Sequence, residues 1–285
     1  MKDISLYIPC YNAARFLPTV LPAVMNQTHP LREVLVVDDG SLDDTAAVAQ
    51  SFAGSARYPL RILRQPGNLG LAVARNTAIR SLDTEYIAAL DSDVAPSPDW
   101  LEHLAKEMTD EVSGVGGELL ETYQTTLADR WRTVHMVQHR GPNRVVRPPF
   151  LWGCNTLFRR SVLFEAGLYD EYCKTNAEDV KLCEAIRDRH VLIYTHLAKC
   201  RHLRRDTPKS LMRNYWKWYY YGCYQPVSPA RALASNARNL RRLWGVIQKD
   251  VADGDLARLL ISLPLLPYTC IRDWIDLVQR RGEPM

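Results

Sequence analysis

The stretch Tyr86-Ile-Ala-Ala-Leu-Asp91-Ser-Asp93 decides the fold, because a short apolar run ends there in two carboxylates one residue apart. The run is brief and is followed by Pro96 and Pro98, which is typical of a buried strand. Asp91 and Asp93 therefore lie at the carboxyl end of a strand, where open α/β sheets bind ligands. Two such acids can share a cation like Mg²⁺, which also takes phosphate oxygens and water. A simple turn is the alternative, since Asp favours turns.

Strand-like and helical segments alternate on both sides of this stretch. Upstream, the apolar pattern predicts strands over 4–8, 33–37 and 60–63 and helices over 13–27, 44–52 and 68–82. Downstream, we expect helices over 98–108 and 176–189 and strands over 112–120, 150–158 and 191–194. Residues 123–147 have no clear assignment and are a candidate acceptor loop. The alternation predicts a Rossmann-like α/β fold, a mainly parallel sheet flanked by helices.

The chain changes character at about residue 205. Residues 1–204 form the expected catalytic domain, and 205–285 form a helical, basic C-terminal region for acceptor, membrane or subunit contacts. The uncharged run 259–271 is broken by two prolines and is too short to span a membrane. Aromatic residues crowd the start of the region, at Tyr215, Trp216, Trp218, Tyr219, Tyr220, Tyr221 and Tyr224.

The charge distribution and the cysteine content indicate the cellular compartment and the classes of partner that the protein can bind. The net charge is +4, but from Lys199 to the end 16 Lys and Arg stand against 7 Asp and Glu, a net of +9. Such a basic segment suits nucleic acid, anionic lipid or a phosphate-bearing substrate. The 7 cysteines include no C-x-x-C pair, and Met1 leads into a strand without a signal peptide. We therefore expect a cytoplasmic protein, at most attached to the cytoplasmic face of a membrane.

Five polar motifs follow expected strands or open expected helices. They are Pro9-Cys-Tyr11-Asn12, Asp38-Asp39-Gly40-Ser41, Asn68-x-Gly70 with Ala74-Arg75-Asn76, Asp91-Ser92-Asp93, and Glu178-Asp179. Over about residues 4–202 this ordered set resembles family 2 glycosyltransferases of the GT-A fold. The resemblance implies a nucleotide-diphosphate sugar donor, most commonly a UDP-sugar, a Mn²⁺ or Mg²⁺ ion, and inversion at the anomeric carbon.

The resemblance also implies which residues line the nucleotide. Tyr11 offers a flat face to a base, Asn12 an amide, and Asp39 a carboxylate that accepts from uracil or ribose. A tyrosine packed on its own helix is one structural alternative, and Ser41 with Asp44 also matches a helix capping box. The full expected set is Pro9, Tyr11, Asn12, Asp39, Asn68, Arg75, Asp91 and Ser92.

Arg75 lies inside one of the expected helices, near its start. From there it can reach back to the base or the diphosphate, because guanidinium suits phosphate. The alternative is a solvated arginine on the helix surface.

The metal is implied to bind Asp93, with Asp91 contacting ribose or reaching the metal through water. His202 follows the last expected strand and is the candidate third ligand, of the metal or of the diphosphate. A lone histidine is often structural, and the arginines at 201, 204 and 205 are alternative diphosphate ligands.

The pair Glu178-Asp179 opens an expected helix. The resemblance makes Asp179 the catalytic base, with Glu178 as the second choice. Acids in a first turn also complement the helix dipole, which is the structural alternative. Trp152 and Gly153 are expected to floor the sugar or acceptor pocket, with core packing as the alternative for Trp152.

The expected activity is transfer of a single sugar to an acceptor hydroxyl on a carbohydrate or a lipid-linked glycan. Processive relatives carry Gln-x-x-Arg-Trp and membrane spans, whereas Arg241-Arg242-Leu-Trp244 lacks the Gln and has the wrong spacing. A nucleotidylyltransferase is one alternative, although no Gly-rich phosphate loop follows the first strand. A binding module that holds RNA or an anionic surface through the basic aromatic segment is the other. We expect no nucleic-acid partner, because helical packing of those aromatics is the simpler interpretation.

Overall fold

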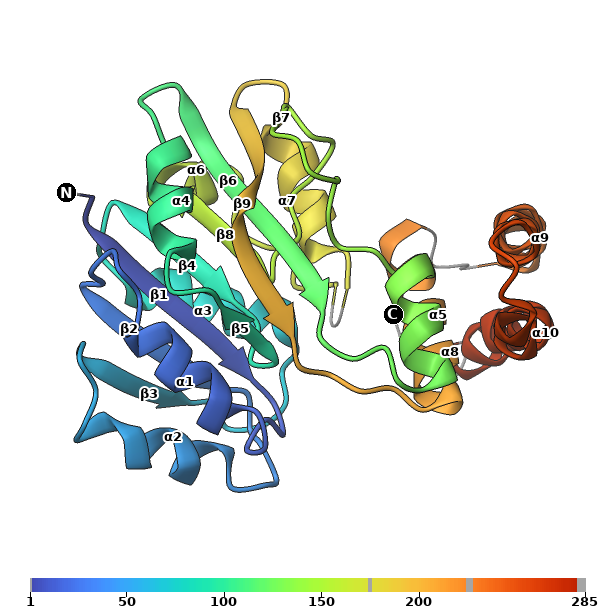
Figure 1. Cartoon of the computed structure of the whole chain (residues 1–285), viewed down its shortest axis with the longest axis horizontal. Coiled ribbons are helices and arrows are strands. Elements are labelled where there is room, and N and C mark those ends of the chain that lie inside the picture. Colours follow the sequence, from blue (N-terminus) through green and yellow to red (C-terminus); the bar gives the residue numbers. More distant parts are fainter. Residues whose placement is uncertain (1, 174–175, 224–227, 281–285) are drawn as a thin grey trace. The chain divides into compact units, whose positions relative to one another are not determined.

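The structure is a computed structural model that describes residues 2–173, 176–223 and 228–280 (Figure 1). Its contacts divide the chain into two compact units. The first unit, here called the sheet unit, joins Met1–Thr122 to Gln138–Arg204. The second, the helical unit, joins Tyr123–Val137 to Arg205–Met285. The segment 123–137 thus goes with the C-terminal helices, although it lies within the first two-thirds of the sequence.

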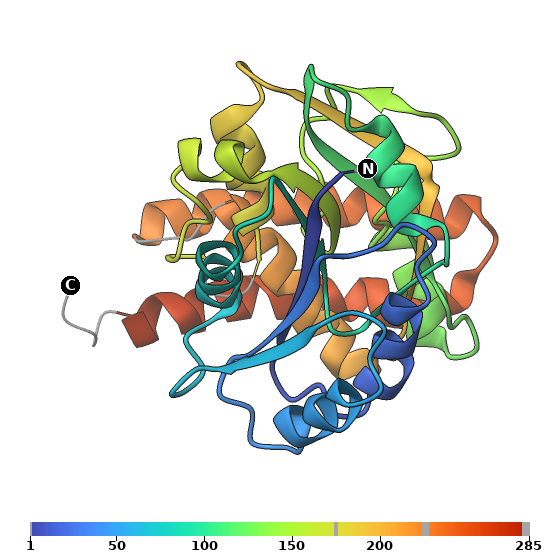
Figure 2. The same cartoon turned by 90° about the vertical axis from the view of Figure 1, so that its left-hand side faces the viewer.

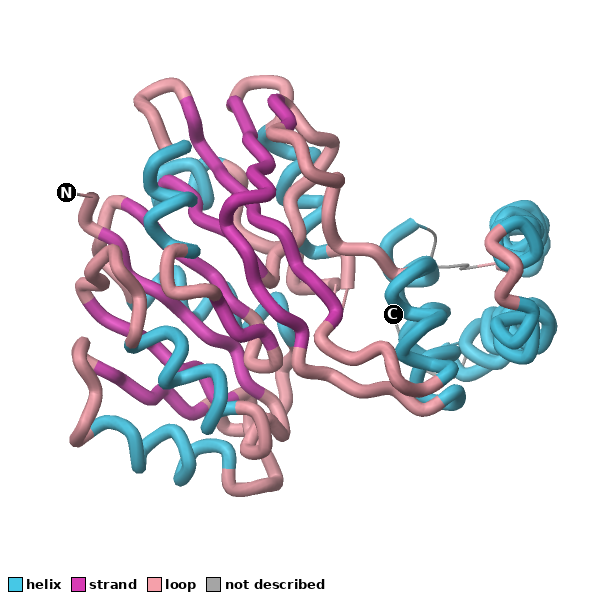
Figure 3. Tube along the Cα trace, viewed as in Figure 1, coloured by secondary structure: helices cyan, strands magenta, loops and turns pink. Residues whose placement is uncertain are grey.

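A single mixed sheet forms the centre of the sheet unit, with strand order β3-β2-β1-β4-β8-β6-β9-β5 and β7 paired to β9 (Figure 3). The neighbours β3, β2, β1 and β4 are parallel, as expected, while β8 runs antiparallel to β4 and β6. The strands are β1 (Ile4–Cys10), β2 (Glu33–Asp38), β3 (Leu60–Arg64), β4 (Tyr86–Leu90), β5 (Val94–Pro96), β6 (Val112–Glu121), β7 (Val145–Val146), β8 (Asn155–Arg159) and β9 (Val191–His202).

Two expected strands have different bounds in the structure. The expected strand over 150–158 begins only at Asn155, because the Asn155 N–H closes a turn onto the Trp152 carbonyl. The expected strand over 191–194 continues to His202, and its far end pairs with β5. This extension carries His202 into the region of Asp93.

Helices cover both faces of the sheet (Figures 1 and 3). One face holds α1 (Leu17–Met25), α2 (Thr45–Ala53) and α4 (Trp100–Glu107), and the other holds α3 (Leu71–Ser81), α6 (Arg160–Glu165) and α7 (Glu178–Ile186). The capping box expected at Ser41 and Asp44 is wrong, because α2 starts at Thr45 with no side-chain cap from Asp44. Ser41 Oγ instead accepts from the Asn12 N–H.

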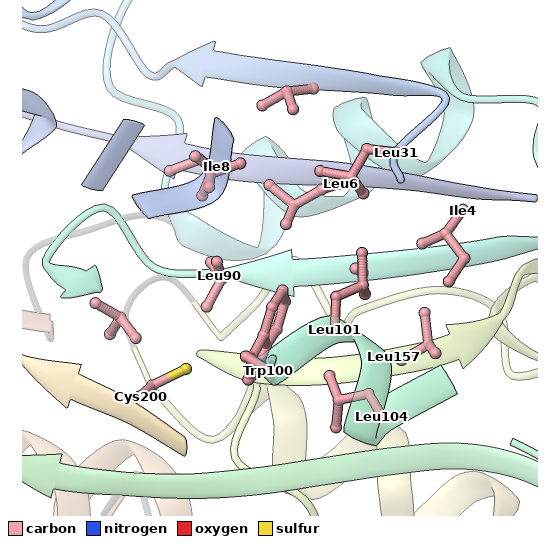
Figure 4. Close-up of a cluster of buried hydrophobic side chains, with 14 of the residues drawn as sticks. Ile4, Leu6, Ile8, Leu31, Leu90, Trp100, Leu101, Leu104, Leu157 and Cys200 are labelled. Carbon is pink, nitrogen blue, oxygen red and sulfur yellow. The ribbon is translucent and has the colours of Figure 1, made fainter. Parts of the chain in front are cut away.

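The apolar core explains why these elements form three layers. One core cluster lies between the sheet and α4 (Figure 4). It includes Leu6 and Ile8 of β1, Leu90 of β4, and Trp100 and Leu104 of α4. These side chains are almost fully buried. Burial of apolar area at roughly 25 cal/mol per Å² is the main force that holds such layers together.

The helical unit consists of α5 (Leu127–His135), α8 (Pro208–Cys223), α9 (Pro229–Ala252), the short η1 (Leu256–Arg258) and α10 (Leu259–Arg280). In α5, Thr126 and Asp129 form a reciprocal capping box, a signal that the sequence carried within the unassigned segment. The run 259–271 lies inside α10, which continues through both prolines. Among the described residues, no helix is both long enough and apolar enough to cross a membrane.

The aromatic residues of α8 pack inward where their side chains are described. Tyr215 and Trp216 are buried, and Tyr215 meets Trp131 of α5 edge to face at 5.3 Å. Trp216 Nε1 donates to Asp273 Oδ1 of α10 at 2.8 Å. These contacts favour helical packing over a stacking surface for RNA, and the side chains of Tyr220, Tyr221 and Tyr224 lie outside the described residues.

Candidate active site

The sheet topology gathers the predicted polar residues at one edge. Because β1, β2 and β4 are parallel, their carboxyl ends deliver Pro9, Asp39 and Asp91 to the same side. The pairing of Val94 with His202 then sets the end of β9 beside Asp93. The edge is therefore built from segments distant in sequence.

A pocket of about 170 Å³ lies at this edge, within the sheet unit. Tyr11 is 45% exposed there, so its ring is not packed away on its own helix. The pocket is lined by Pro9, Cys10, Tyr11, Asp39, Asn68, Gly70, Leu71 and Ala74. The expected nucleotide residues Asn12, Arg75, Asp91 and Ser92 are not part of this lining.

Asp39 shapes the pocket by holding the loop before α3. It is 4% exposed, and its carboxylate accepts the N–H groups of Leu69 at 2.8 Å and Gly70 at 2.9 Å. Burial raises the pKa of Asp39, and these two hydrogen bonds oppose the rise. Gly40 allows the close approach of the two loops, since a Cβ there would stand 2.4 Å from the Gly67 carbonyl carbon.

Asn12 connects loops instead of facing the pocket. Its N–H donates to Ser41 Oγ at 2.9 Å, and its Oδ1 accepts from the Leu42 N–H at 2.9 Å. It adopts a positive φ of 52°, which Asn tolerates better than most residues. Its side-chain oxygen thus ties the loop after β1 to the loop after β2.

Arg75 forms the centre of a buried ionic cluster. It is 2% exposed, so the solvated alternative is wrong. Its Nη2 lies 2.8 Å from Asp91 Oδ1 and 3.7 Å from Glu178 Oε1, and its guanidinium sits over the Tyr169 ring at 5.3 Å. Arg75 therefore links the Asp91-Ser-Asp93 motif to the Glu178-Asp179 motif.

Gly153 completes this cluster because it has no side chain. A Cβ there would lie 1.8 Å from Arg75 Nη1, so the guanidinium occupies the space that a side chain would need. The Gly153 N–H donates to Asp179 Oδ2 at 2.9 Å. Position 153 thus touches both the ionic cluster and the candidate base.

The two acids at the start of α7 differ in their surroundings. The N-cap is Ala177, whose φ is 70°, and it makes no side-chain cap. Glu178 is 3% exposed, and burial raises its pKa to about 7. The positive charge of Arg75 lowers this pKa, and the negative charge of Asp179 raises it. Asp179 is only half-buried, and its Oδ1 accepts from the Val180 N–H. Asp179 is therefore the more accessible of the two carboxylates.

Asp93 and His202 are the residues that fit a divalent cation. Asp93 Oδ2 lies 3.4 Å from His202 Nε2, while His202 Nδ1 lies 3.0 Å from Glu121 Oε2. A histidine held on one nitrogen by a carboxylate presents its other nitrogen in the manner of a metal ligand. Among the described residues, no group of three or more His, Cys, Asp or Glu side chains is arranged to hold a metal ion.

Trp152 lies between the site and the core. It packs partly against both apolar clusters of the sheet unit, and it meets Phe150 edge to face at 5.2 Å. Arg140 stands over its ring at 4.7 Å. Sequence reasoning missed Glu121, Arg140 and Tyr169, since no motif marks them and only their tertiary contacts connect them with the site.

The family model for Glycosyl transferase family 2 matches residues 5–165, more than half of the chain. The chain belongs to glycosyltransferase family 2. This match ends before Glu178, Asp179 and His202, so the placement of these three residues rests on the geometry described above.

Curated relatives of this family 2 chain are glycosyltransferases by name. Glycosyltransferase AglE of Haloferax volcanii is 38% identical over 133 residues, covering 45% of this chain and 43% of the relative. Putative glycosyltransferase EpsH of Bacillus subtilis is 29% identical over 170 residues, covering 56% and 48%. Chondroitin synthase of Escherichia coli is 37% identical over 111 residues, covering 39% and 16%. The chain thus matches less than half the length of each relative.

Solved structures confirm the GT-A fold of this family 2 chain. The mannosyltransferase PcManGT from Pyrobaculum calidifontis, in complex with GDP-Man and Mn²⁺, aligns with a TM-score of 0.60 at 19% identity and covers 98% of this chain and 88% of its own. S. aureus TarS 1–349 in complex with UDP aligns with a TM-score of 0.59 at 16% identity, covering 99% and 92%. The expected α/β sheet with a helical C-terminal region is confirmed.

Proposed function

We propose that the chain transfers a single sugar, with inversion, from a nucleotide-diphosphate sugar to an acceptor hydroxyl. The observation that carries the proposal is the Arg75 link, which brings the Asp91-Ser-Asp93 motif next to the Glu178-Asp179 motif. A donor site and a candidate base are needed side by side for direct displacement at an anomeric carbon.

The donor nucleotide binds in the pocket beside Tyr11, with Pro9, Asp39 and Asn68 around it. The exposed Tyr11 ring stacks on the base, and the free lone pairs of Asp39 accept from the base or the ribose. PcManGT was solved with GDP-Man and TarS with UDP, so similar folds accept different bases. A UDP-sugar is the first donor to test.

Asp93 and His202 would hold a divalent ion, Mn²⁺ or Mg²⁺, and Glu121 would orient the imidazole. When bound, the ion neutralises charge on the departing diphosphate. The support is the facing pair Asp93 Oδ2 and His202 Nε2 and the Mn²⁺ in the PcManGT complex.

Asp179 accepts the proton of the acceptor hydroxyl. As the acceptor oxygen bonds to the anomeric carbon, the bond from that carbon to the β-phosphate oxygen breaks and the nucleoside diphosphate leaves. The Gly153 N–H fixes the carboxylate of Asp179, while buried Glu178 positions Arg75 and is not itself the base. General-base catalysis by a positioned side chain is typically worth on the order of 10²–10⁴-fold in rate.

The acceptor is the hydroxyl of a carbohydrate or a lipid-linked glycan, with Trp152 as the apolar floor of its subsite. Partial burial and the Arg140 contact hold this ring in place. We place the reaction in the cytoplasm, at the cytoplasmic face of a membrane.

Release of nucleoside diphosphate from a panel of UDP- and GDP-sugars, with Mn²⁺, Mg²⁺ or EDTA, tests this function. We expect metal-dependent release that an oligosaccharide or lipid-linked acceptor accelerates. A nucleotidylyltransferase would instead release pyrophosphate from a nucleoside triphosphate and a sugar 1-phosphate. Pyrophosphate release without donor cleavage would overturn the proposal.

A further inference from the structure

The exposed surface of α9 and α10 carries an unusual number of large apolar side chains. Trp244 of α9 is 62% exposed and Leu260 of α10 is 73% exposed. The full set is Leu233, Leu240, Trp244 and Val251 on α9, Leu256 in η1, and Leu260, Leu263, Ile271, Ile275 and Val278 on α10. Single exposed leucines need no explanation, but a concentration of this size marks an interaction surface.

On α9 these residues form one stripe. Leu233, Leu240, Trp244 and Val251 are spaced by seven, four and seven residues, which returns to the same side of a helix with about 3.6 residues per turn. A different side of α9, about 100° round the helix and including Leu243 and Asp250, is buried in the helical unit. The exposed stripe is therefore additional to the apolar face that folds the unit.

On α10 the exposed side carries almost no charge. Its first half, 259–271, has no charged residue, and of the three charged residues that follow before Arg280, Asp273 is buried while Arg272 and Asp276 are half-buried. The two long helices run side by side and are joined at one end by η1 (Figure 2). Two neighbouring helices thus each expose an apolar stripe.

Two exposed arginines stand on α9 outside the stripe itself. At about 100° per residue, Arg241 lies about 80° and Arg231 about 160° round the helix from Leu233, and neither is in an ion pair among the described residues. Apolar residues with an exposed tryptophan and free basic groups fit an interfacial helix on an anionic lipid surface. A symmetric contact with a second copy would bring these arginines against another basic surface, which is unfavourable.

We propose that α9 and α10 form a docking face for an anionic membrane surface, into which their apolar stripes insert. The proposed function includes association with a membrane, and this proposal says which surface makes that contact. The contact is made by α9 and α10, and not by the aromatic residues of α8, which pack inward. It does not depend on the sugar-transfer chemistry, because vesicle binding is measured without donor or acceptor.

Vesicle co-sedimentation of the full chain tests the face. The probes are vesicles of phosphatidylcholine alone and of equal parts phosphatidylcholine and phosphatidylglycerol. We expect the wild-type chain to sediment with the anionic vesicles. The variant with Trp244→Gln, Leu260→Gln and Leu263→Gln should partition on the order of 100-fold less, because it loses the inserted apolar area.

A second variant isolates the charge. Arg241→Gln should lower partition on anionic vesicles about fivefold, with no change on neutral ones, and Arg231→Gln, on the side of α9 away from the stripe, should lower it less. The matched control is Val146→Gln with Phe164→Gln, which replaces exposed apolar residues of the sheet unit and should bind like wild type. Melting curves confirm that each variant is folded.

Two results overturn the proposal. One is equal partition of wild type and the apolar triple variant. The other is a wild-type chain that ignores both vesicle types but dimerises in solution, with the triple variant monomeric, since the face would then join two copies.

Discussion

Buried carboxylates have opposite fates in the two units. In the helical unit two of them bond to neighbouring helices: Asp273 accepts from Trp216, Ser235 and Asn239, and Asp250 from His135 and Ser262. In the sheet unit the acids gather at one edge, and Asp179 remains half-buried beside the cluster. A buried carboxylate whose oxygens all accept hydrogen bonds from protein groups stabilises the fold. A carboxylate at the edge of a sheet keeps lone pairs that can bind a ligand.

The largest effect should come from Asp93→Ala. It removes the carboxylate of the Asp93–His202 pair, so we expect transfer to be abolished and diphosphate binding to weaken more than nucleoside binding. EDTA should have the same effect on wild type. Calorimetry with UDP and with uridine measures the two affinities, and turnover that persists in EDTA would show the metal role to be wrong.

Asp179→Asn tests whether the accessible carboxylate acts as the catalytic base or only stabilises the fold. We expect a loss on the order of 10²–10⁴-fold in transfer with near-normal melting and donor binding, because Asn keeps the size but not the basic carboxylate. The contrasting variant is Asp273→Asn, which should lower stability while the folded protein remains active. Substantial transfer by folded Asp179→Asn would move the base to Glu178.

Gly153→Ala should damage stability and activity together. The added Cβ would lie 1.8 Å from Arg75 Nη1, so the buried cluster must shift at a cost of about 1–3 kcal/mol. Gly245→Ala in α9 is the control: nothing lies within 4 Å of its Cβ, and helix propensity predicts a gain of up to about 1 kcal/mol. Urea unfolding compares the two, and equal stability of both variants would contradict the tight packing at position 153.

The smallest effect concerns pH and His135. Burial lowers the pKa of His135 below its ordinary value, against the hydrogen bond to Asp250. As pH falls, His135 therefore takes up a proton at a higher pH in the unfolded chain than in the folded chain. The contribution of the neutral His135 to folding stability is complete above about pH 6.5 and is lost as pH falls through the folded pKa. Unfolding followed by tryptophan fluorescence should show a shallower loss on acidification in His135→Gln, and an identical slope would exclude this histidine as a cause.

The sequence predicted the sheet unit well where the signal was local. The strand Tyr86–Leu90 and the acids after it agree with the structure, as does the exposed ring of Tyr11, and the helix predicted over 176–189 is present over Glu178–Ile186. Residues 123–147 received no assignment from the sequence. The reason is that α5 buries its short apolar face against helices that follow some 70 residues later, so the local pattern is weak.

Site residues divide in the same way. Tyr11, Asp39 and Asn68 line the pocket, because each follows a strand that ends there, and their nucleotide role stays a prediction. Asn12 and Arg75 were also predicted to contact the ligand, and the structure shows Asn12 in a loop contact and Arg75 in an ionic cluster, so their role toward a ligand stays a prediction.

The sequence by itself determined most of the strands and helices of the sheet unit, the family motifs and the acids at strand ends, since apolar periodicity and turn residues act over a few neighbouring positions. Only the tertiary structure decided that Arg75 joins Asp91 to Glu178, that His202 faces Asp93, and that α9 and α10 expose apolar stripes. Such contacts join residues up to 109 positions apart. They depend on sheet order, strand register and helix packing, which no short window of sequence contains.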